Sequence, residues 1–265
     1  MTTPRLPAPL AALGVLGGLL LLLPFVGLAV QVPLRELPAL LSGEVALEAL
    51  RLSLASSTLA TLVSLLLGLP LAYLLARHDF PGRRLLRGVV LLPLVLPPVV
   101  GGAALLFALG RRGLVGAQLE AATGIVLPFS FAGVVLAVTF ISMPFLVVTV
   151  EGALRGLDGR HEAAAATLGA GRWTVLWRVT LPLVRPSLVA GLALTWARAI
   201  GEFGATLTFA GSLAGRTRTL PLAIFVALEQ DRDVAIALSL LMVVLSLAVV
   251  VPLRDRWWGR AGSGP

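Results

Sequence analysis

The sequence contains no cysteine and no lysine, and only 13% of its residues are charged. Without cysteine there can be no disulfide framework, thiol nucleophile or thiolate metal site. Without lysine there can be no Schiff-base lysine and no lysine-bearing phosphate loop of a conventional ATPase. The two histidines, His78 and His161, lie far apart in polar segments, so a histidine metal site is not expected. These absences disfavour a membrane enzyme, which would need a cluster of polar reactive groups.

Apolar residues dominate the composition of the chain. They make up 58% of the 265 residues, and the mean hydropathy is +0.98. Soluble domains carry roughly 25% charged residues, so the composition predicts an integral membrane protein, all-α, with residues 1–265 as a single transmembrane domain. The net charge of +8 comes from arginines in short segments between apolar runs. The preference of basic residues for the cytoplasmic side explains them without nucleic acid.

Six apolar runs are long enough to cross a bilayer, given about 1.5 Å per helical residue and a hydrocarbon core of roughly 30 Å. They lie at residues 10–30, 50–76, 88–109, 131–150, 188–210 and 234–253. A cleaved signal peptide is the alternative for the first run. Signal peptides usually have an apolar region of about 7–15 residues, so a retained span is expected.

The third run is interrupted by Pro93, Pro97 and Pro98, so it cannot form a straight helix. In a membrane, the freed backbone groups are tolerated only where protein or a wet cavity meets them. Helix N-termini or free amides at such a break could face an anion. The three prolines are therefore candidates for a translocation path.

The distribution of arginine predicts the orientation. One set of connecting segments, which includes both termini and the segment around Glu162, holds thirteen arginines, and the other set holds six. The richer side is expected to be cytoplasmic. Both termini and the segment around Glu162 should then face the cytoplasm.

Within the cytoplasmic segment 155–182, residues 159–182 form the longest moderately polar passage of the chain, GRHEAAAATLGAGRWTVLWRVTLP. Alanine and leucine favour helix, and glycine commonly follows a helix end. This pattern predicts a short helix over 160–168, closed by Gly169. Its alanine surface would let another protein approach the backbone closely. An amphipathic helix lying on the bilayer is the alternative.

This passage resembles the EAA loop of ABC-importer permeases, which has an acid, alanines and a glycine, then nine residues, an aliphatic residue, one more residue and Leu-Pro. In that family the loop is the coupling helix, which sits in a cleft of the cytoplasmic ATPase. Glu162 stands seven residues before Gly169, whereas the general pattern has six. The resemblance implies ATPase-coupling roles for Glu162, Ala164, Ala165, Gly169, Ala170, Leu181 and Pro182.

Five further blocks, in the family's order, are similar to the permeases of molybdate importers, and the seven-residue spacing also resembles that subfamily. They are HDFPG at 78–82, LPLVLPPVV at 92–100, GRRG at 110–113, ARAIGEFGAT at 197–206 and TRTLP at 217–221. The resemblance implies a type I importer permease with six transmembrane helices in the cell (inner) membrane. Two copies would enclose the pathway. A sulfate/thiosulfate or tungstate permease is the alternative.

The resemblance also implies the partners. Two cytoplasmic ATPases would bind ATP and Mg²⁺, so this chain would need no cofactor and would not itself be an enzyme. An extracytoplasmic oxyanion-binding protein would deliver the cargo. Closure of the ATPases would draw the paired coupling helices together and switch the pore from inward-facing to outward-facing.

Arg198 and Glu202 stand four residues apart inside the fifth run and are expected to pair on one helix face. A lone charge at mid-membrane costs roughly 3 to more than 10 kcal/mol. The pair is either part of an oxyanion path, with Arg198 supplying positive potential, or a self-neutralising structural clamp. A stripe of small residues could let another helix pack alongside, and it consists of Ala193, Ala197, Gly201 and Ala205. Glu202 is the only acid within a predicted span, and a secondary transporter would need a proton or sodium relay and inverted repeats, which the sequence does not display.

Overall fold

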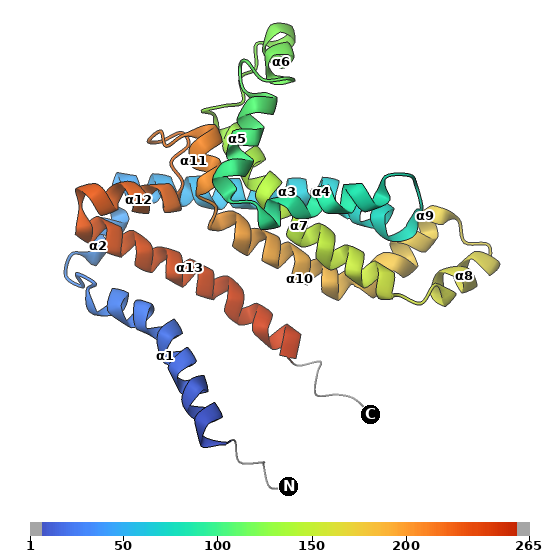
Figure 1. The fold of residues 1–265 in the computed structure, drawn as a ribbon, viewed down its shortest axis with the longest axis horizontal. Coiled ribbons are helices and arrows are strands. Elements are labelled where there is room, and N and C mark those ends of the chain that lie inside the picture. The colour runs from blue at the N-terminus through green and yellow to red at the C-terminus, as the bar shows by residue number, and fades with distance from the viewer. Residues whose placement is uncertain (1–6, 259–265) are drawn as a thin grey trace.

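The structure, a computed structural model, describes residues 7–258, and all regular secondary structure in that range is helical (Figure 1). The elements are α1 (Ala8–Val30), α2 (Leu37–Ser42), α3 (Glu44–Arg77), α4 (Arg83–Val95), α5 (Pro98–Leu109), α6 (Gly116–Thr123), α7 (Phe131–Gly156), α8 (Arg160–Thr167), α9 (Arg172–Val175), η1 (Leu176–Thr180), α10 (Leu181–Ile200), α11 (Gly204–Ala210), α12 (Leu220–Gln230) and α13 (Arg232–Trp258). The predicted all-α architecture is confirmed over the described residues.

Five helical stretches within residues 7–258 are long and apolar enough to cross a membrane, judged by length and composition: α1, α3, α7, Arg172–Ile200 and Arg232–Val249. They overlap five of the six predicted runs. The run 131–150 continues as helix to Gly156, and the run 50–76 begins earlier, at Glu44. The stretch Arg172–Ile200 begins before the predicted run 188–210 and ends before it does. The third run, 88–109, is divided between α4 and α5.

Two of the predicted runs are broken near their middle. The first break lies at Leu96-Pro97, where both residues have extended backbone. A residue before proline is disfavoured in the helical conformation, and Pro97 and Pro98 cannot donate backbone hydrogen bonds. The second break divides the run 188–210, because α10 ends at Ile200 and α11 begins at Gly204.

The centre of the molecule is formed by α3, α7 and α10, which lie side by side (Figure 1). Their shared core is a cluster of buried residues, Ala72, Leu75, Leu146, Val147, Val150, Leu154 and Val184. The helices approach closely where side chains are small. A Cβ on Gly191 of α10 would lie 3.1 Å from Leu146 Cδ1 of α7, and a Cβ on Gly68 of α3 would lie 3.2 Å from Met143 Cγ. By contrast, α1 has no buried residue and contacts α13.

The closest approach of two helices outside this core joins α5 to α11. A Cβ on Gly102 would lie 2.7 Å from the carbonyl oxygen of Ala205 and 2.9 Å from its Cα. Gly204, at the start of α11, faces Pro98 and Val99 at the start of α5 in the same way. The two breaks are therefore brought together, although more than 100 residues of sequence separate them.

We expect Gly102→Val to lower the free energy of unfolding by about 1–3 kcal/mol, because the new side chain would push α5 away from the α11 backbone. Unfolding in mixed detergent micelles measures this loss. Gly88→Val is the matched control, since a Cβ on Gly88 of α4 meets nothing within 4 Å. Equal stability of the two variants would show that the α5–α11 contact is looser than described.

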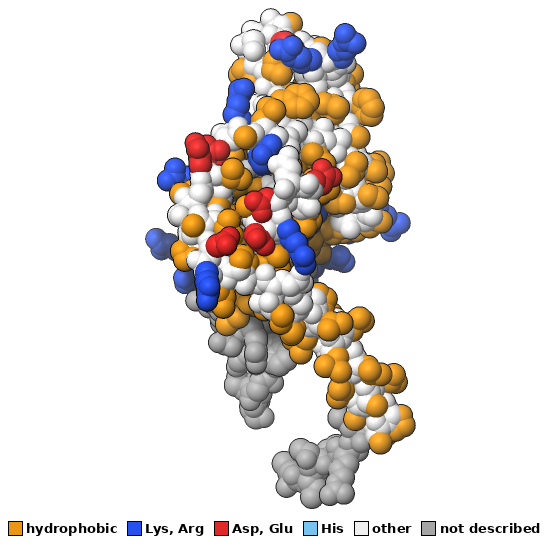
Figure 2. All heavy atoms as spheres, turned by 90° about the vertical axis from the view of Figure 1, so that its left-hand side faces the viewer, with side chains coloured by type: hydrophobic (Ala, Val, Ile, Leu, Met, Phe, Trp, Pro, Cys, Tyr) orange, Lys and Arg blue, Asp and Glu red, His pale blue; other side chains and the backbone are white. Residues whose placement is uncertain are grey.

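The two ends of the molecule differ in charge. One end carries α8, α9 and the α3–α4 turn, and the opposite end carries α2, α12 and the start of α13 (Figure 1). Figure 2 views the α2–α12 end, where acidic side chains gather at the centre with basic ones around them. Residues 31–51 and 211–233, which include α2, the start of α3 and α12, contain the acids Glu36, Glu44, Glu48, Glu229, Asp231 and Asp233. The α8–α9 end holds nine arginines and four acids over residues 77–87 and 151–185.

Candidate functional site

Helix α8 is a short helix that protrudes at the arginine-rich end and stops at Gly169. Its first amide, that of Arg160, donates to Asp158 Oδ1 at 3.1 Å. At the other end, the amides of Gly169 and Ala170 donate to the carbonyls of Ala166 and Ala165. Gly169 has φ of +83°, the left-handed conformation that glycine adopts at such a cap. The helix ends one residue before the predicted limit of Leu168.

The carboxylate of Glu162 is directed toward its own chain. Its Oε1 accepts from Arg77 Nη2, at the last residue of α3, at 3.1 Å. The same oxygen accepts from the buried hydroxyl of Thr180 at 2.7 Å. Hydrogen bonds to a charged group are about twice as strong as neutral ones. Glu162 thus fastens α8 to the end of α3 and to η1.

Most of the remaining surface of α8 is open. Ala163, Ala164 and Ala166 are exposed, Ala165 is half-buried, and the side chain of Leu168 is 89% exposed. This surface has little side-chain bulk, so another protein's groove could reach the backbone. Of the remaining sequence-predicted residues, Ala170 is half-buried beside the cap, whereas Leu181 and Pro182 lie in the first turn of α10. Leu181 packs against the central core and does not belong to the open face.

A π-helical turn, η1, connects α9 to α10 and carries Thr180. The amide of Leu181 donates to the carbonyl of Leu176, five residues earlier. The next residue, Pro182, has no amide hydrogen for the carbonyl of Arg178, which favours a local change of helix winding. Such turns are frequent at functional positions. Here the turn places Thr180 against Glu162.

The three prolines proposed for the translocation path do not lie together in one helix: Pro93 is in α4, Pro97 is in the break and Pro98 begins α5. Pro93 is buried within α4, one turn before the break, whereas Pro97 is exposed and Pro98 is half-buried at the start of α5. Pro98 Cβ would lie 3.1 Å from a Cβ on Gly204, which stands two residues after Glu202. Pro98 and Glu202 therefore share one neighbourhood.

Arg198 and Glu202 form an ion pair at 2.7 Å, although they do not lie on one continuous helix. Because α10 ends at Ile200, Glu202 lies in the break, where its Oε1 also accepts from the amide of Ala205 at 2.8 Å. The side chain of Glu202 is 1% exposed and that of Arg198 is 28% exposed. The charge of the carboxylate is thus balanced by Arg198 and stabilised by a backbone amide, and Arg198 keeps a partly open face.

The small residues of α10 that pack within the chain differ from the predicted stripe. The buried face of α10 includes Gly191, Thr195 and Ala199, and Gly191 meets Leu146 and Thr149 of α7. Of the predicted stripe, Ala193 and Ala197 are half-buried and Gly201 is exposed, whereas Ala205 is buried in α11, where it packs against Gly102 of α5. Both sets repeat every four residues, so periodicity alone could not distinguish the two faces.

Sequence reasoning missed three residues of these sites, Arg77, Thr180 and Glu151. Arg77 and Thr180 hold Glu162, and neither stands near it in the sequence. Glu151 lay just outside the predicted run 131–150, but α7 continues to Gly156 and buries it. Glu151 is therefore an acid within a long apolar helix, whereas Glu202 lies in the break after α10. The sequence did offer one signal for Glu151, since this acid directly follows the apolar run 131–150 and the helix could extend to include it.

Comparison with known proteins gives a family match and close relatives. Residues 64–257 match the family model described as "Binding-protein-dependent transport system inner membrane component". The chain is 50% identical over 234 residues to the molybdenum transport system permease protein ModB of Mycobacterium tuberculosis, covering 88% of each. It is 40% identical over 228 residues to the sulfate transport system permease protein CysW of Synechococcus elongatus, covering 84% of this chain and 79% of that protein.

Among solved structures, the fold is similar to a chain of a bacterial alginate ABC transporter, crystallised in complex with an alginate pentasaccharide-bound periplasmic protein. The TM-score is 0.74 at 19% identity, and the match covers 97% of this chain and 96% of that chain. At this identity the likeness concerns the fold alone.

Proposed function

Because this chain belongs to the family of binding-protein-dependent transport system inner membrane components, we propose that it is the permease subunit of an ATP-driven importer of molybdate or a similar tetrahedral oxyanion. It is a multi-pass membrane protein and a translocation component. The greater identity to a molybdenum permease than to a sulfate permease supports molybdate as the cargo.

The observation that carries this proposal is the geometry of α8. A helix with an open alanine face, stopped by a left-handed glycine and fastened on its other side through Glu162, suits docking into a groove of another protein. A cytoplasmic ATPase is the partner we propose for it, one for each permease of a homodimer. The exposed Leu168, next to the glycine cap, would add an apolar contact to that groove.

The distribution of arginines and acids between the two ends of the molecule supports an orientation in the membrane. The α8–α9 end is rich in arginine, whereas the α2–α12 end has six acids against five arginines over residues 31–51 and 211–233. Basic segments favour the cytoplasmic side of a membrane. We place α8 and both termini in the cytoplasm, and the α2–α12 end outside, where an oxyanion-binding protein would dock.

For the path, the two neighbouring helix breaks are the candidate region. The charge of Glu202 is met by Arg198 and by an α11 amide, so it would not repel an incoming dianion strongly. Arg198 keeps an accessible face and would offer positive potential. Binding there must remain weak enough for release, as in other conducting pathways.

The test is reconstitution of the chain into liposomes with its partner ATPase and its extracytoplasmic binding protein. We expect molybdate uptake that requires both ATP and the binding protein, with tungstate as a competitor. Sulfate uptake in place of molybdate would assign the chain to the sulfate class. Uptake driven by an ion gradient without the ATPase would refute the importer assignment.

A further inference from the structure

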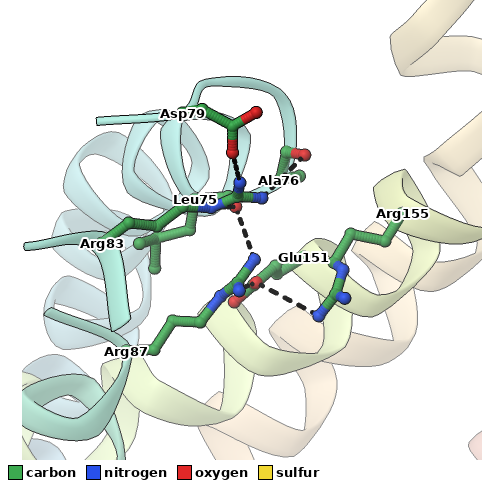
Figure 3. Close-up of polar contacts among 7 residues, drawn as sticks. All are labelled: Leu75, Ala76, Asp79, Arg83, Arg87, Glu151 and Arg155. Carbon is green, nitrogen blue, oxygen red and sulfur yellow. Dashed lines mark hydrogen bonds and ion pairs between the residues drawn. The ribbon is translucent and has the colours of Figure 1, made fainter. Parts of the chain in front are cut away.

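The end of α3 makes polar contacts with two other elements, α4 and α8. The carbonyl of Leu75 accepts from Arg83 Nε at 2.9 Å and from Arg87 Nη2 at 2.8 Å, and the carbonyl of Ala76 accepts from Arg83 Nη2 at 3.4 Å (Figure 3). The last carbonyls of a helix have no partner within it. Two arginines of α4 therefore cap α3, while Arg77 of the same turn binds Glu162 of α8.

The cap of α3 is tied in turn to α7 through Glu151. Arg87 Nε donates to Glu151 Oε1 at 2.6 Å, and Arg155 Nη1 lies 3.9 Å from the same oxygen (Figure 3). The side chain of Glu151 is 12% exposed, and it belongs to a helix that is otherwise largely apolar. A buried carboxylate needs a partner of this kind, because removing one member of a buried pair leaves an uncompensated charge.

Helix α4 has few other attachments to the rest of the molecule. Leu86 and Val90 pack against the central core, and Pro93 is its one buried residue. Arg83 and Arg87 lie in its first two turns, so its polar ties are at the end near α8. The 13 residues of α4 extend about 20 Å at 1.5 Å per residue to the Leu96-Pro97 break, beyond which α5 packs on α11.

We propose that the Arg87–Glu151 pair, together with the Leu75 carbonyl, is the joint that transmits displacement of α8 to α4 and hence to the paired helix breaks. This inference rests on the proposed function. Arg87 and Glu151 are accordingly positioning residues of transport: they touch neither ATP nor cargo. Their role is to make α3, α4 and α7 move together when α8 is pulled.

The geometry gives a physical reason for this role. From α8 to α4 the chain of contacts is Glu162 to Arg77, one turn of α3, and Leu75 to Arg87. Each polar link involves a charged group, and such hydrogen bonds are shorter and stronger than neutral ones. Glu151 fixes the direction of the Arg87 side chain, so α4 cannot swing independently of α7. Without Glu151, α4 would keep its apolar contacts and its arginine cap on α3 but would lose its polar tie to α7, and it would then lag behind α8.

The experiment compares Glu151→Gln with Glu120→Gln in the reconstituted transporter, measuring molybdate transported and ATP hydrolysed. Glu120 is the matched control because its ion pair with Arg111 spans 3.5 Å at the surface, with Arg111 69% exposed. For Glu151→Gln we expect ATP hydrolysis to persist and transport per ATP to fall about tenfold, because the Gln oxygen can still accept from Arg87 but the hydrogen bond loses its charge assistance. Glu120→Gln should transport as the unmodified chain does.

A second measurement separates transmission from simple destabilisation, and the absence of cysteine makes it practical. A spin label at Val244→Cys on α13, outside the proposed joint, serves as the reference. Its distance to a label at Val95→Cys reports on α4, and its distance to a label at His161→Cys reports on α8, with labelled chains diluted into unlabelled ones. All three positions are exposed. In Glu151→Gln the nucleotide-dependent distance change at His161 should remain, whereas the change at Val95 should be lost.

The outcomes distinguish this inference from the function on which it rests. No ATP-dependent uptake by the unmodified chain would refute the proposed function. Uptake by the unmodified chain, with Glu151→Gln equal to Glu120→Gln, would overturn the joint alone. If Glu151→Gln fails to fold, the double variant Arg87→Met/Glu151→Met removes both charges and avoids an orphaned one. Normal transport per ATP in that variant would likewise overturn the inference.

Discussion

The Gly169→Val variant is expected to insert into the membrane normally and to lose ATP-coupled transport by about 10- to 100-fold. Gly169 has φ of +83°, and a Cβ there meets nothing within 4 Å. The cost therefore comes from the backbone alone, and a non-glycine residue in this conformation costs about 1–3 kcal/mol. To relieve that strain, the cap of α8 would rearrange and its open face would no longer fit the ATPase.

Transport and ATP hydrolysis in proteoliposomes, with membrane insertion measured in parallel, test this expectation. Gly171→Val is the matched control. Gly171 lies two residues away, has φ of −67° and ψ of 160°, and also has open space at its Cβ. A valine fits that backbone without strain. Normal transport by Gly169→Val would refute α8 as the docking element, and equal loss in both variants would show that bulk rather than conformation matters.

The Arg198→Ala variant is expected to be destabilised by about 3–5 kcal/mol, because Glu202 would remain buried without its counter-charge. The amide of Ala205 would still donate to Glu202 Oε1, but the Arg198 guanidinium, 2.7 Å from the other oxygen, would be gone. Unfolding in mixed detergent micelles gives the free-energy difference. A loss below about 1 kcal/mol, typical of exposed pairs, would mean that water reaches Glu202.

The double variant Arg198→Ala/Glu202→Gln then separates the two interpretations of this pair. The side-chain amide that Glu202→Gln introduces is uncharged, and its oxygen can still accept from the amide of Ala205, so stability should largely return. If Arg198 supplies positive potential to the path, the double variant is stable but transports poorly. If the pair is only a clamp, stability and transport return together.

Local sequence was enough to predict several helix ends, helix breaks and one ion pair of this protein. Gly169 ends α8 because a left-handed cap follows from its own lack of a side chain. The prolines at 97 and 98 break the third run because they lack an amide hydrogen, and Arg198 pairs with Glu202 because only four residues separate them. Each of these effects involves neighbours along the chain. The apolar runs were equally clear, since a bilayer-spanning helix satisfies its backbone within one segment.

Contacts between distant segments were decided by the tertiary structure. Glu162 meets Arg77 and Thr180, Gly102 meets Ala205, and Arg87 meets Glu151, each pair brought together by packing rather than by spacing. The small residues of α10 show the same dependence on packing. Small residues repeat every four positions on two faces of this helix, and only the position of α7 decides that the face with Gly191, and not the face with Ala193, is buried. Local sequence thus determined where the apolar helices lie and where two of them break, although α3 begins earlier and α7 ends later than predicted. The packing of those helices decided which side chains meet, because a buried charge or a close backbone contact depends on a partner that the sequence does not place nearby.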